Sequence, residues 1–445
     1  MPESRRRDAV RSLLVDMEPV RLDRDFRMVW LGQIVNGLGR QVTIVALPFE
    51  LWNLTHNSLS IGLLAVVQLV PILLFSLGGG AIADAVDRRR LLIATQLLLA
   101  LASLMFAVLA SQPSPPVWAF YVIAFGAAGI SAIDSPARSS ALPRLVPRER
   151  LAAAIAVNWL SSNTVAIASP AFAGILIAQS SVATAFAFDV VTYGASLVAL
   201  LIIAPIPPHP EAHASFRAIG EGLQFALRRR VVLATFAIDF NAMLFGMPSA
   251  LFPQLALTVF NAGAVGYGLL NAAPALGAFL GAAFSGWIGR VQRPGRGVAI
   301  AVAVWGVSIA AFGLCTFSFP LALVFLAIAG MADLVSAVFR ASIVQLSTPD
   351  RLQGRVTSIH MLVVTSGPRL GDAEAAGVAA VAGPQFSVVS GGVMCLLGML
   401  AVLPLFPQLL DYRHSLERNG DEERAAPGER IEPRLADPER VVRTD

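Results

Sequence analysis

Long apolar segments separated by short polar breaks recur along almost the whole chain. Windows of mostly hydrophobic residues, bounded by charged residues, Pro or Gly, fall into two sets. They lie near residues 28–51, 59–83, 90–111, 116–141, 151–179 and 183–205, and then near 231–258, 264–289, 297–318, 320–345, 353–382 and 386–407. A membrane-spanning helix needs about 20 apolar residues, and each window is long enough. The pattern predicts an all-α membrane protein with twelve transmembrane helices.

The polar segments divide this helical pattern into five regions. Residues 206–230 are rich in Pro and Arg, and Asp134 and Arg138 of the first set are echoed by Asp333 and Arg340 in the second. Internal repeats of this kind build the two halves of many secondary transporters. We therefore predict a cytoplasmic N-terminal tail (1–27), a six-helix bundle (28–205), a cytoplasmic linker (206–230), a second six-helix bundle (231–407) and a disordered cytoplasmic tail (408–445).

Composition and charge narrow the class of protein. The 445 residues are 56% hydrophobic and 14% charged, whereas soluble domains carry about 25% charged residues, so a soluble globular protein is excluded. All 33 basic residues are Arg, and the absence of Lys excludes a Walker A phosphate loop. Cys315 and Cys395 have no metal or redox spacing.

The arginines are distributed unevenly among the loops. They cluster at Arg88–Arg90, Arg144–Arg150 and Arg290–Arg296, while the loops on the other side, such as 52–58 and 112–115, carry none. By the positive-inside rule, we expect a multi-pass protein of the cell (inner or plasma) membrane with both termini in the cytoplasm. The basic isoelectric point, near 9.6, then follows from topology, and we expect no nucleic-acid partner.

A motif after the second window resembles a known signature. It reads Gly80-Ala-Ile-Ala-Asp84-Ala-Val-Asp87-Arg88-Arg89-Arg90, and it is similar to the signature loop of the major facilitator superfamily, with Ala85 where the family usually has Arg. Residues 134–151 and 367–374 resemble the drug and siderophore exporters of that superfamily, the enterobactin-exporter-like branch, and the resemblance extends from about residue 25 to 410. It implies two six-helix bundles, transport by alternating access, and export.

The resemblance also implies a conformational switch. Its members here are Gly80, Asp84, Arg88, Arg89, Asp134 and Arg138. In the family the Asp of the loop lies near the start of helix 11, so Asp84 would accept from amides near Gln353–Arg355, where the helix dipole favours an anion. Arg88 would pair with Asp84 and Asp134 while the halves touch on the cytoplasmic side, which would stabilise the outward-open state.

A second motif, Ser169, Pro170 and Gly174, resembles the antiporter motif of the family's exporters, with Ser169 and Ala173 replacing two glycines. Small residues let helices approach closely, and Pro bends a helix. The same residues would also suit ordinary helix packing without any exporter meaning, so both interpretations stay open.

Polar and charged residues inside the apolar windows are candidates for substrate binding or proton coupling, because a charge in the bilayer costs at least ~2.5 kcal/mol. The candidates are Asn36, Arg40, Asp239, Asn241, Asp333, Arg369, Asp372 and Glu374. For Arg40 the alternative is a structural ion pair, and for Asp239 and Asp333 it is a neutral carboxyl in helix packing. Arg369, Asp372 and Glu374, with Glu50 and Asp189, would either serve transport or close an outer gate. His360 would carry protons or pack between helices.

These observations favour a proton-coupled exporter, an antiporter for small amphipathic molecules such as multiple drugs or siderophores. We expect no enzymatic activity, no metal and no cofactor beyond the proton motive force. The expected partners are a small-molecule substrate and the lipid bilayer, with the protein a monomer. Three alternatives compete: a metabolite or sugar facilitator or importer, a lipid flippase or scramblase, and a membrane scaffold without transport.

Overall fold

The computed structural model of the chain describes residues 17–204 and 223–413, except for the side chains of residues 76–85, 140, 142, 350 and 351. Within these ranges every regular element is a helix, as the apolar pattern predicts. The predicted tails and linker fall largely outside the described residues. Where the predicted N-terminal tail and C-terminal tail adjoin the bundle, the short helices α2 (Glu18–Leu22) and α17 (Pro407–Asp411) are present.

The helices of the first half follow the predicted windows closely. They are α3 (Arg24–Thr55), α4 (Ser58–Ala85), α5 (Arg88–Ala110), α6 (Val117–Ala141), α7 (Leu151–Gln179) and α8 (Val182–Ile202). Two short 3₁₀ segments, Leu142–Arg144 and Arg148–Arg150, connect α6 to α7. At the tight turn between α3 and α4, His56 has a φ of 48°, and the Asn57 side chain caps α4 by accepting from the Leu59 amide.

The helices of the second half also match the predicted windows, with one break. They are α10 (Arg230–Phe245), α11 (Phe252–Gln254), α12 (Gly263–Ala283), α13 (Pro294–Leu314), α14 (Phe319–Ser347), α15 (Asp350–Ala382) and α16 (Pro384–Leu405). A 3₁₀ turn (Ser249–Leu251) precedes α11, a π segment (Leu255–Val259) follows it, and a further 3₁₀ segment (Ser285–Arg290) follows α12.

The single helix predicted over 231–258 is interrupted after Phe245, at the sequence Gly246-Met247-Pro248. The cause is local, since Pro248 has no N–H to continue the helical ladder and Gly246 is a weak helix former. The Gly246 carbonyl, freed from the ladder, accepts a 3.0 Å hydrogen bond from the Trp305 indole of α13. The break therefore anchors α10 to α13 and creates a short non-helical segment inside the second half.

Ten helices of the described chain are long and apolar enough to cross a membrane. The remaining long helices, α3 and α15, have 32 and 33 residues, and both carry several charged residues. Helix length therefore does not separate them from the ten. They lack a stretch as apolar and as poor in charge as those of the other ten, since polar residues such as Gln33, Asn36 and Arg40 in α3 interrupt the apolar sequence.

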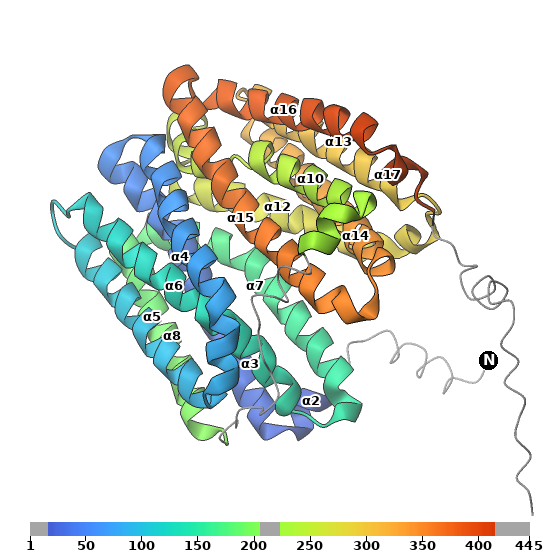
Figure 1. The fold of residues 1–445 in the computed structure, drawn as a ribbon. Helices are drawn as coiled ribbons and strands as arrows, with labels where there is room; N and C mark the ends of the chain where they lie inside the picture. The colour runs from blue at the N-terminus through green and yellow to red at the C-terminus, as the bar shows by residue number, and fades with distance from the viewer. Residues whose placement is uncertain (1–16, 205–222, 414–445) are drawn as a thin grey trace, which may run out of the picture.

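The helices pack as two groups that follow chain order (Figure 1). In the first, α3 packs on α8, α5 packs on α6 and α8, and α4 packs on α6. In the second, α14 packs on α12 and α13, and α13 packs on α16. The groups meet where α7 packs on α12 and where α4 packs on α15. In Figure 1, α4 and α15 converge at one end and diverge toward the other.

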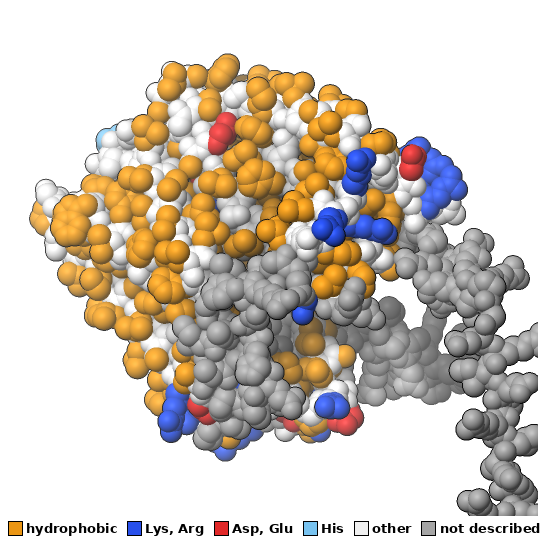
Figure 2. All heavy atoms as spheres, viewed as in Figure 1, with side chains coloured by type: hydrophobic (Ala, Val, Ile, Leu, Met, Phe, Trp, Pro, Cys, Tyr) orange, Lys and Arg blue, Asp and Glu red, His pale blue; other side chains and the backbone are white. Residues whose placement is uncertain are grey.

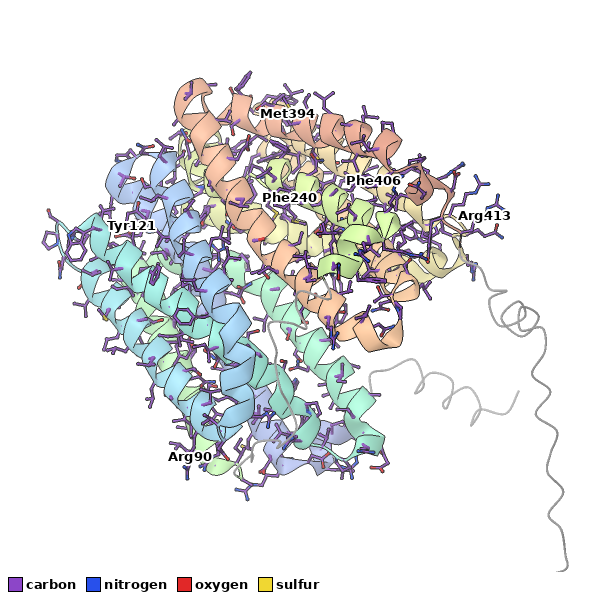
Figure 3. The ribbon with its side chains drawn as sticks, viewed as in Figure 1. Arg90, Tyr121, Phe240, Met394, Phe406 and Arg413 are labelled. Carbon is purple, nitrogen blue, oxygen red and sulfur yellow. The ribbon has the colours of Figure 1, made fainter. Side chains whose placement is uncertain are left out.

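The outer surface is largely apolar (Figure 2). On the face shown there, arginines gather at the lower and right-hand edges and the remaining surface is mostly hydrophobic. Mid-helix residues such as Leu97, Val191 and Ile300 are more than half exposed, which fits contact with lipid. Figure 3 places Arg90 and Arg413 at the same two edges and Tyr121 at the opposite end of the first group. We refer to these opposite ends as the arginine-rich and arginine-free ends.

Candidate functional site

A cavity of about 890 Å³ lies between the first helix group and α15. Its walls come from α3, α4, α5, α6 and α8 on one side and from α15 on the other. Apolar lining residues include Leu47, Leu64, Leu99 and Phe106, and hydroxyl, amide and charged groups are interspersed among them. Cavities of 300–1,000 Å³ with apolar walls and a few polar groups are typical of small-molecule sites.

The cavity is closed at the arginine-free end by hydrogen bonds between the two halves. Ser58 donates to Gln254 at 2.5 Å, and the Tyr267 hydroxyl donates to the Val45 carbonyl at 2.9 Å. Arg369 donates to Gln68, which joins α15 to α4. Toward the arginine-rich end the cavity lining extends to Ser139 and Gly354.

Glycines make the closed end tight. A Cβ on Gly62 would lie 2.7 Å from the Ala376 Cβ, which shows how closely α4 and α15 approach. In the antiporter-like motif, a Cβ on Gly174 would lie 2.6 Å from the Ala264 carbonyl, and a Cβ on Gly268 would lie 2.6 Å from the Pro170 carbonyl. Gly174 and the buried Ser169 and Pro170 thus serve close packing of α7 on α12, one of the two interpretations of this motif.

Asp189 is the most elaborately held polar group of the cavity wall. Its carboxylate is buried and accepts from Thr43 of α3 at 2.7 Å, from Ser103 of α5 at 2.6 Å and from Thr192 at 3.3 Å. A Cβ at Gly39 would overlap Thr192 and Asp189, so α3 needs glycine there. The sequence suggested transport or an outer gate for Asp189 and no role for Thr43 or Ser103.

Arg40, a candidate for substrate binding or proton coupling, is exposed and lines this cavity. It also lines a smaller cavity of about 200 Å³ between α3 and α7, together with Asn36 and Arg138. The spacing of Asn36, Arg40 and Thr43 predicts that they lie on one face of α3, because residues three and four apart share a helix face. That face borders the two cavities. Asn36 itself is buried, and its Oδ1 accepts no hydrogen bond within the described residues.

Asp239 and Asp333 meet at a buried cluster instead of the cavity. Arg340 Nη2 of α14 lies 2.8 Å from Asp239 Oδ1 of α10 and 3.7 Å from Asp333 Oδ1. His360 Nε2 of α15 lies 3.7 Å from Asp239 Oδ2, and Ser336 accepts from Arg340 at 2.7 Å. The Asp239 side chain is 0% exposed and that of Asp333 is 37% exposed. Within the described residues, the lining of the 890 Å³ cavity includes neither carboxylate.

The other candidates of the second half hold helices together. Asn241 donates to the Cys395 carbonyl at 2.9 Å, which joins α10 to α16. Asp372 accepts from the Ser249 hydroxyl at 2.5 Å and from the Ala250 amide at 2.8 Å, so it secures the segment after the break in α10. Glu374 lies on the same helix and is partly buried. Of the charged candidates on α15, Arg369 lines the cavity.

The predicted switch is partly described. The surroundings of Gly80 and Asp84 are not among those that the structure describes. Arg88 is buried, and Arg89 donates to the Leu200 and Leu201 carbonyls at 2.7 Å each, which ties α5 to the end of α8. In α6, Asp134 forms a 2.7 Å ion pair with Arg138 and accepts from Thr95 of α5 at 2.7 Å.

A bundle of long apolar helices with a cavity between its two helix groups is the architecture of a polytopic membrane transporter. The chain matches the transmembrane secretion effector family over residues 16–419 and belongs to that family, within the major facilitator superfamily. Membership of this family makes the protein a transporter by class.

Curated relatives and solved structures agree with this assignment. The enterobactin exporter EntS of Citrobacter koseri is 24% identical over 396 residues, and that of Salmonella typhi is 25% identical over 397 residues; each match covers 88% of this chain and 95% of the relative. A POT family transporter superposes with a TM-score of 0.70 at 15% identity, covering 87% and 97% of the two chains. A bacterial homologue of Spinster, inward-facing, superposes at 0.68 with 15% identity, covering 88% and 98%.

Proposed function

We propose that this protein is a secondary active transporter that exports small amphipathic molecules, such as siderophores or drugs, in exchange for protons. The observation that supports it most is the cavity, whose apolar walls and scattered polar groups suit an amphipathic occupant. Its relatives include transporters named for enterobactin export, so a siderophore is the first substrate to test.

The architecture proposed for this function has twelve spans in two six-helix bundles. Ten helices meet the length and hydropathy expected of a span. We assign α3 and α15 as the other two, because Arg40 and Arg369 face the cavity and need not contact lipid. With the arginine-rich end in the cytoplasm, both termini lie on the cytoplasmic side of the cell membrane. The cavity is then reached from the cytoplasm.

Alternating access then requires the arginine-free end to open while the arginine-rich end closes. Ser58 and Tyr267 join the two halves toward the arginine-free end in this structure, and Gln68 joins them beside the cavity. The opposite state is assigned to the switch of Asp84 and Arg88, whose contacts with the second half would form as the arginine-rich ends approach. Each state thus has its own set of contacts between the halves.

Proton coupling is assigned to the Asp239–Asp333 cluster. Asp333 is the better proton carrier, since its side chain is 37% exposed while that of Asp239 is 0% exposed and paired with Arg340. A carboxylate that shares an arginine with a second carboxylate changes the charge balance of the cluster when it takes up a proton. The proton motive force is the only energy source in this proposal. The transporter acts on a small-molecule substrate as a monomer in the bilayer. No nucleic acid takes part.

The test is transport into everted membrane vesicles, whose interior corresponds to the outside of the cell. Energised vesicles that contain the protein are expected to accumulate enterobactin or drugs of a fluorescent panel, and an uncoupler is expected to release them. Vesicles without the protein are the control. Accumulation in right-side-out vesicles would establish import instead, and accumulation that ignores the uncoupler would contradict proton coupling.

A further inference from the structure

Arg40 is a charged residue in the middle of a predicted membrane span, and no described residue pairs with it. It is near the middle of the 32-residue helix α3, where an arginine costs at least ~2.5 kcal/mol in a membrane unless it is solvated or paired. Within the described residues, its guanidinium makes no hydrogen bond and no ion pair, although it lines two cavities. An arginine carries five N–H donors in a fixed fork, so Arg40 offers the cavity a complete anion-binding group.

Asp189, the acid that lines the same cavity, does not neutralise Arg40. Asp189 lies within electrostatic reach of Arg40, but the Asp189 carboxylate accepts hydrogen bonds from Thr43, Ser103 and Thr192. Those hydroxyls satisfy Asp189 inside the wall, where its residue is 1% exposed. Asp189 therefore offsets part of the local positive charge without occupying the donors of Arg40.

The opposite wall of the cavity also presents an arginine. Arg369 of α15 gives one N–H to Gln68 and has further donors in its fork. The charged residues that line the cavity, among those the structure describes, are Arg40, Arg355, Arg369 and Asp189. Asp372 lies within electrostatic reach of Arg369, but it is outside the lining and accepts from Ser249 and Ala250. Even with Arg355 left out of the count, Arg40 and Arg369 outnumber Asp189 in the lining. In a space with low-dielectric walls, this excess of positive charge attracts anions and repels cations.

We propose that the cavity binds an amphipathic organic anion, with one acidic group held by Arg40 of the first half and another held by Arg369 of the second half. The apolar body of such a molecule, aromatic or aliphatic, would pack on Ile44, Leu47, Leu99 and Phe106. Its acidic groups are carboxylates or ionised phenols, whose oxygens match the arginine fork. This inference rests on the proposed transport function and specifies the charge of its substrate.

The experiment compares two dyes that share a three-ring xanthene body and differ in charge. Fluorescein carries a carboxylate and an ionised phenol at pH 8, whereas rhodamine 123 is a cation. Binding of each dye to the full chain in lipid nanodiscs is measured by fluorescence anisotropy. Fluorescein is expected to bind more tightly, and Arg40→Gln and Arg369→Gln are each expected to weaken its binding about tenfold or more, with no loss of rhodamine 123 binding.

Two further variants make the result specific. Arg413→Gln removes an exposed arginine at the edge of the molecule, away from the cavity (Figure 3), and is expected to leave both affinities unchanged. Arg40→Lys keeps the charge but loses the fork, so it should weaken fluorescein binding less than Arg40→Gln does. Size-exclusion profiles report whether each variant folds, and Arg40→Lys keeps the test decisive if Arg40→Gln does not.

The outcomes separate this inference from the transport proposal. Tighter binding of rhodamine 123 than of fluorescein overturns the anion assignment, as does binding of neither dye. Fluorescein binding that resists both Arg40→Gln and Arg369→Gln overturns the assignment of the two arginines. Uncoupler-sensitive transport in everted vesicles is a separate measurement, so it can succeed with a substrate of another charge or fail while the anion still binds.

Discussion

At the scale of single residues, the closed end of the cavity depends on missing side chains. Gly174 and Gly268 let α7 and α12 approach until backbone meets backbone, and Gly62 does the same for α4 and α15. No Cβ fits at Gly174 without a shift, since the Ala264 carbonyl lies 2.6 Å from where it would be. The antiporter-like motif therefore has a physical role in this structure that is independent of any family meaning.

The first prediction concerns that contact. Gly174→Val is expected to weaken the closed arginine-free end by about 1–3 kcal/mol, the usual cost of overpacking, and so to shift the protein toward the opposite access state by roughly five- to 150-fold. The measurement is maleimide labelling of Ser358→Cys, an exposed cavity residue near the arginine-rich end, which should slow. The native Cys315 and Cys395 are buried.

Gly194→Val is the matched control for this labelling. Gly194 lies on α8, and a Cβ there would meet no heavy atom within 4 Å. The same substitution at this open position is expected to leave the labelling rate of Ser358→Cys unchanged. Equal labelling in Gly174→Val and Gly194→Val would mean that the α7–α12 contact does not control access.

At the scale of elements, the buried cluster joins three helices of the second half through one arginine. Arg340 of α14 binds Asp239 of α10 directly and reaches Asp333 of its own helix, and His360 of α15 lies beside Asp239. Breaking a buried pair by removing one charge costs about 3–5 kcal/mol, because the other charge is left uncompensated. The two carboxylates of the cluster should thus respond differently to mutation.

The second prediction is that Asp239→Asn lowers the amount of folded protein, by a loss of about 3–5 kcal/mol of stability. The double variant Asp239→Asn with Arg340→Gln removes both charges and should recover much of that loss. Thermal unfolding of the detergent-purified variants, followed by tryptophan fluorescence, is the measurement. If the double variant is less stable than Asp239→Asn alone, the ion pair does not dominate the cluster.

The third prediction assigns the transport effect to Asp333. Because its side chain is partly exposed and lies 3.7 Å from Arg340, Asp333→Asn should leave folding nearly intact and abolish the dependence of transport on an imposed pH gradient. Counterflow exchange without a gradient should persist. Uptake into everted vesicles at several external pH values is the readout, and an unchanged pH dependence would contradict proton carriage by Asp333.

The sequence predicted the helices well and the site only in part, for physical reasons. A span must be about 20 apolar residues long, so its ends are visible in a single sequence. The break after Phe245 was not predicted, although Gly246 and Pro248 are the residues that cause it. Side-chain partnerships are different. The bonds from Thr43 and Ser103 to Asp189 join three helices, and the pair of Asp239 and Arg340 depends on how α10 and α14 are rotated. Apolar patterning does not determine that rotation in a membrane, where both faces of a helix are hydrophobic.

At the scale of the whole molecule, the two halves are joined by close packing of α7 on α12 and of α4 on α15, and by a small set of side-chain hydrogen bonds among the described residues. Ser58 with Gln254 and Tyr267 with Val45 lie toward the arginine-free end. Gln68 with Arg369 joins α4 to α15 deeper in the molecule, where both residues line the cavity. The binding site proposed above lies between Arg40 of one half and Arg369 of the other. Arg369 therefore lines the cavity and also joins α15 to α4 through Gln68. An anion that competes with Gln68 for the N–H groups of Arg369 would weaken this contact between the halves.

The fourth prediction tests whether opening of this end is required for transport. The double variant Gly62→Cys with Ala376→Cys places one cysteine on α4 and one on α15. A Cβ at position 62 would lie 2.7 Å from the Cβ of residue 376. A small separation of the two helices therefore reaches the spacing of about 3.8 Å between the Cβ atoms of a disulfide. Oxidation is expected to stop transport into everted vesicles, and reduction should restore it. Each single cysteine variant, treated with the same oxidant, is the control. Dye binding in nanodiscs should survive oxidation, because the cavity is still reached from the arginine-rich end. Transport that continues in the fully cross-linked protein would mean that the substrate leaves by a route other than between α4 and α15.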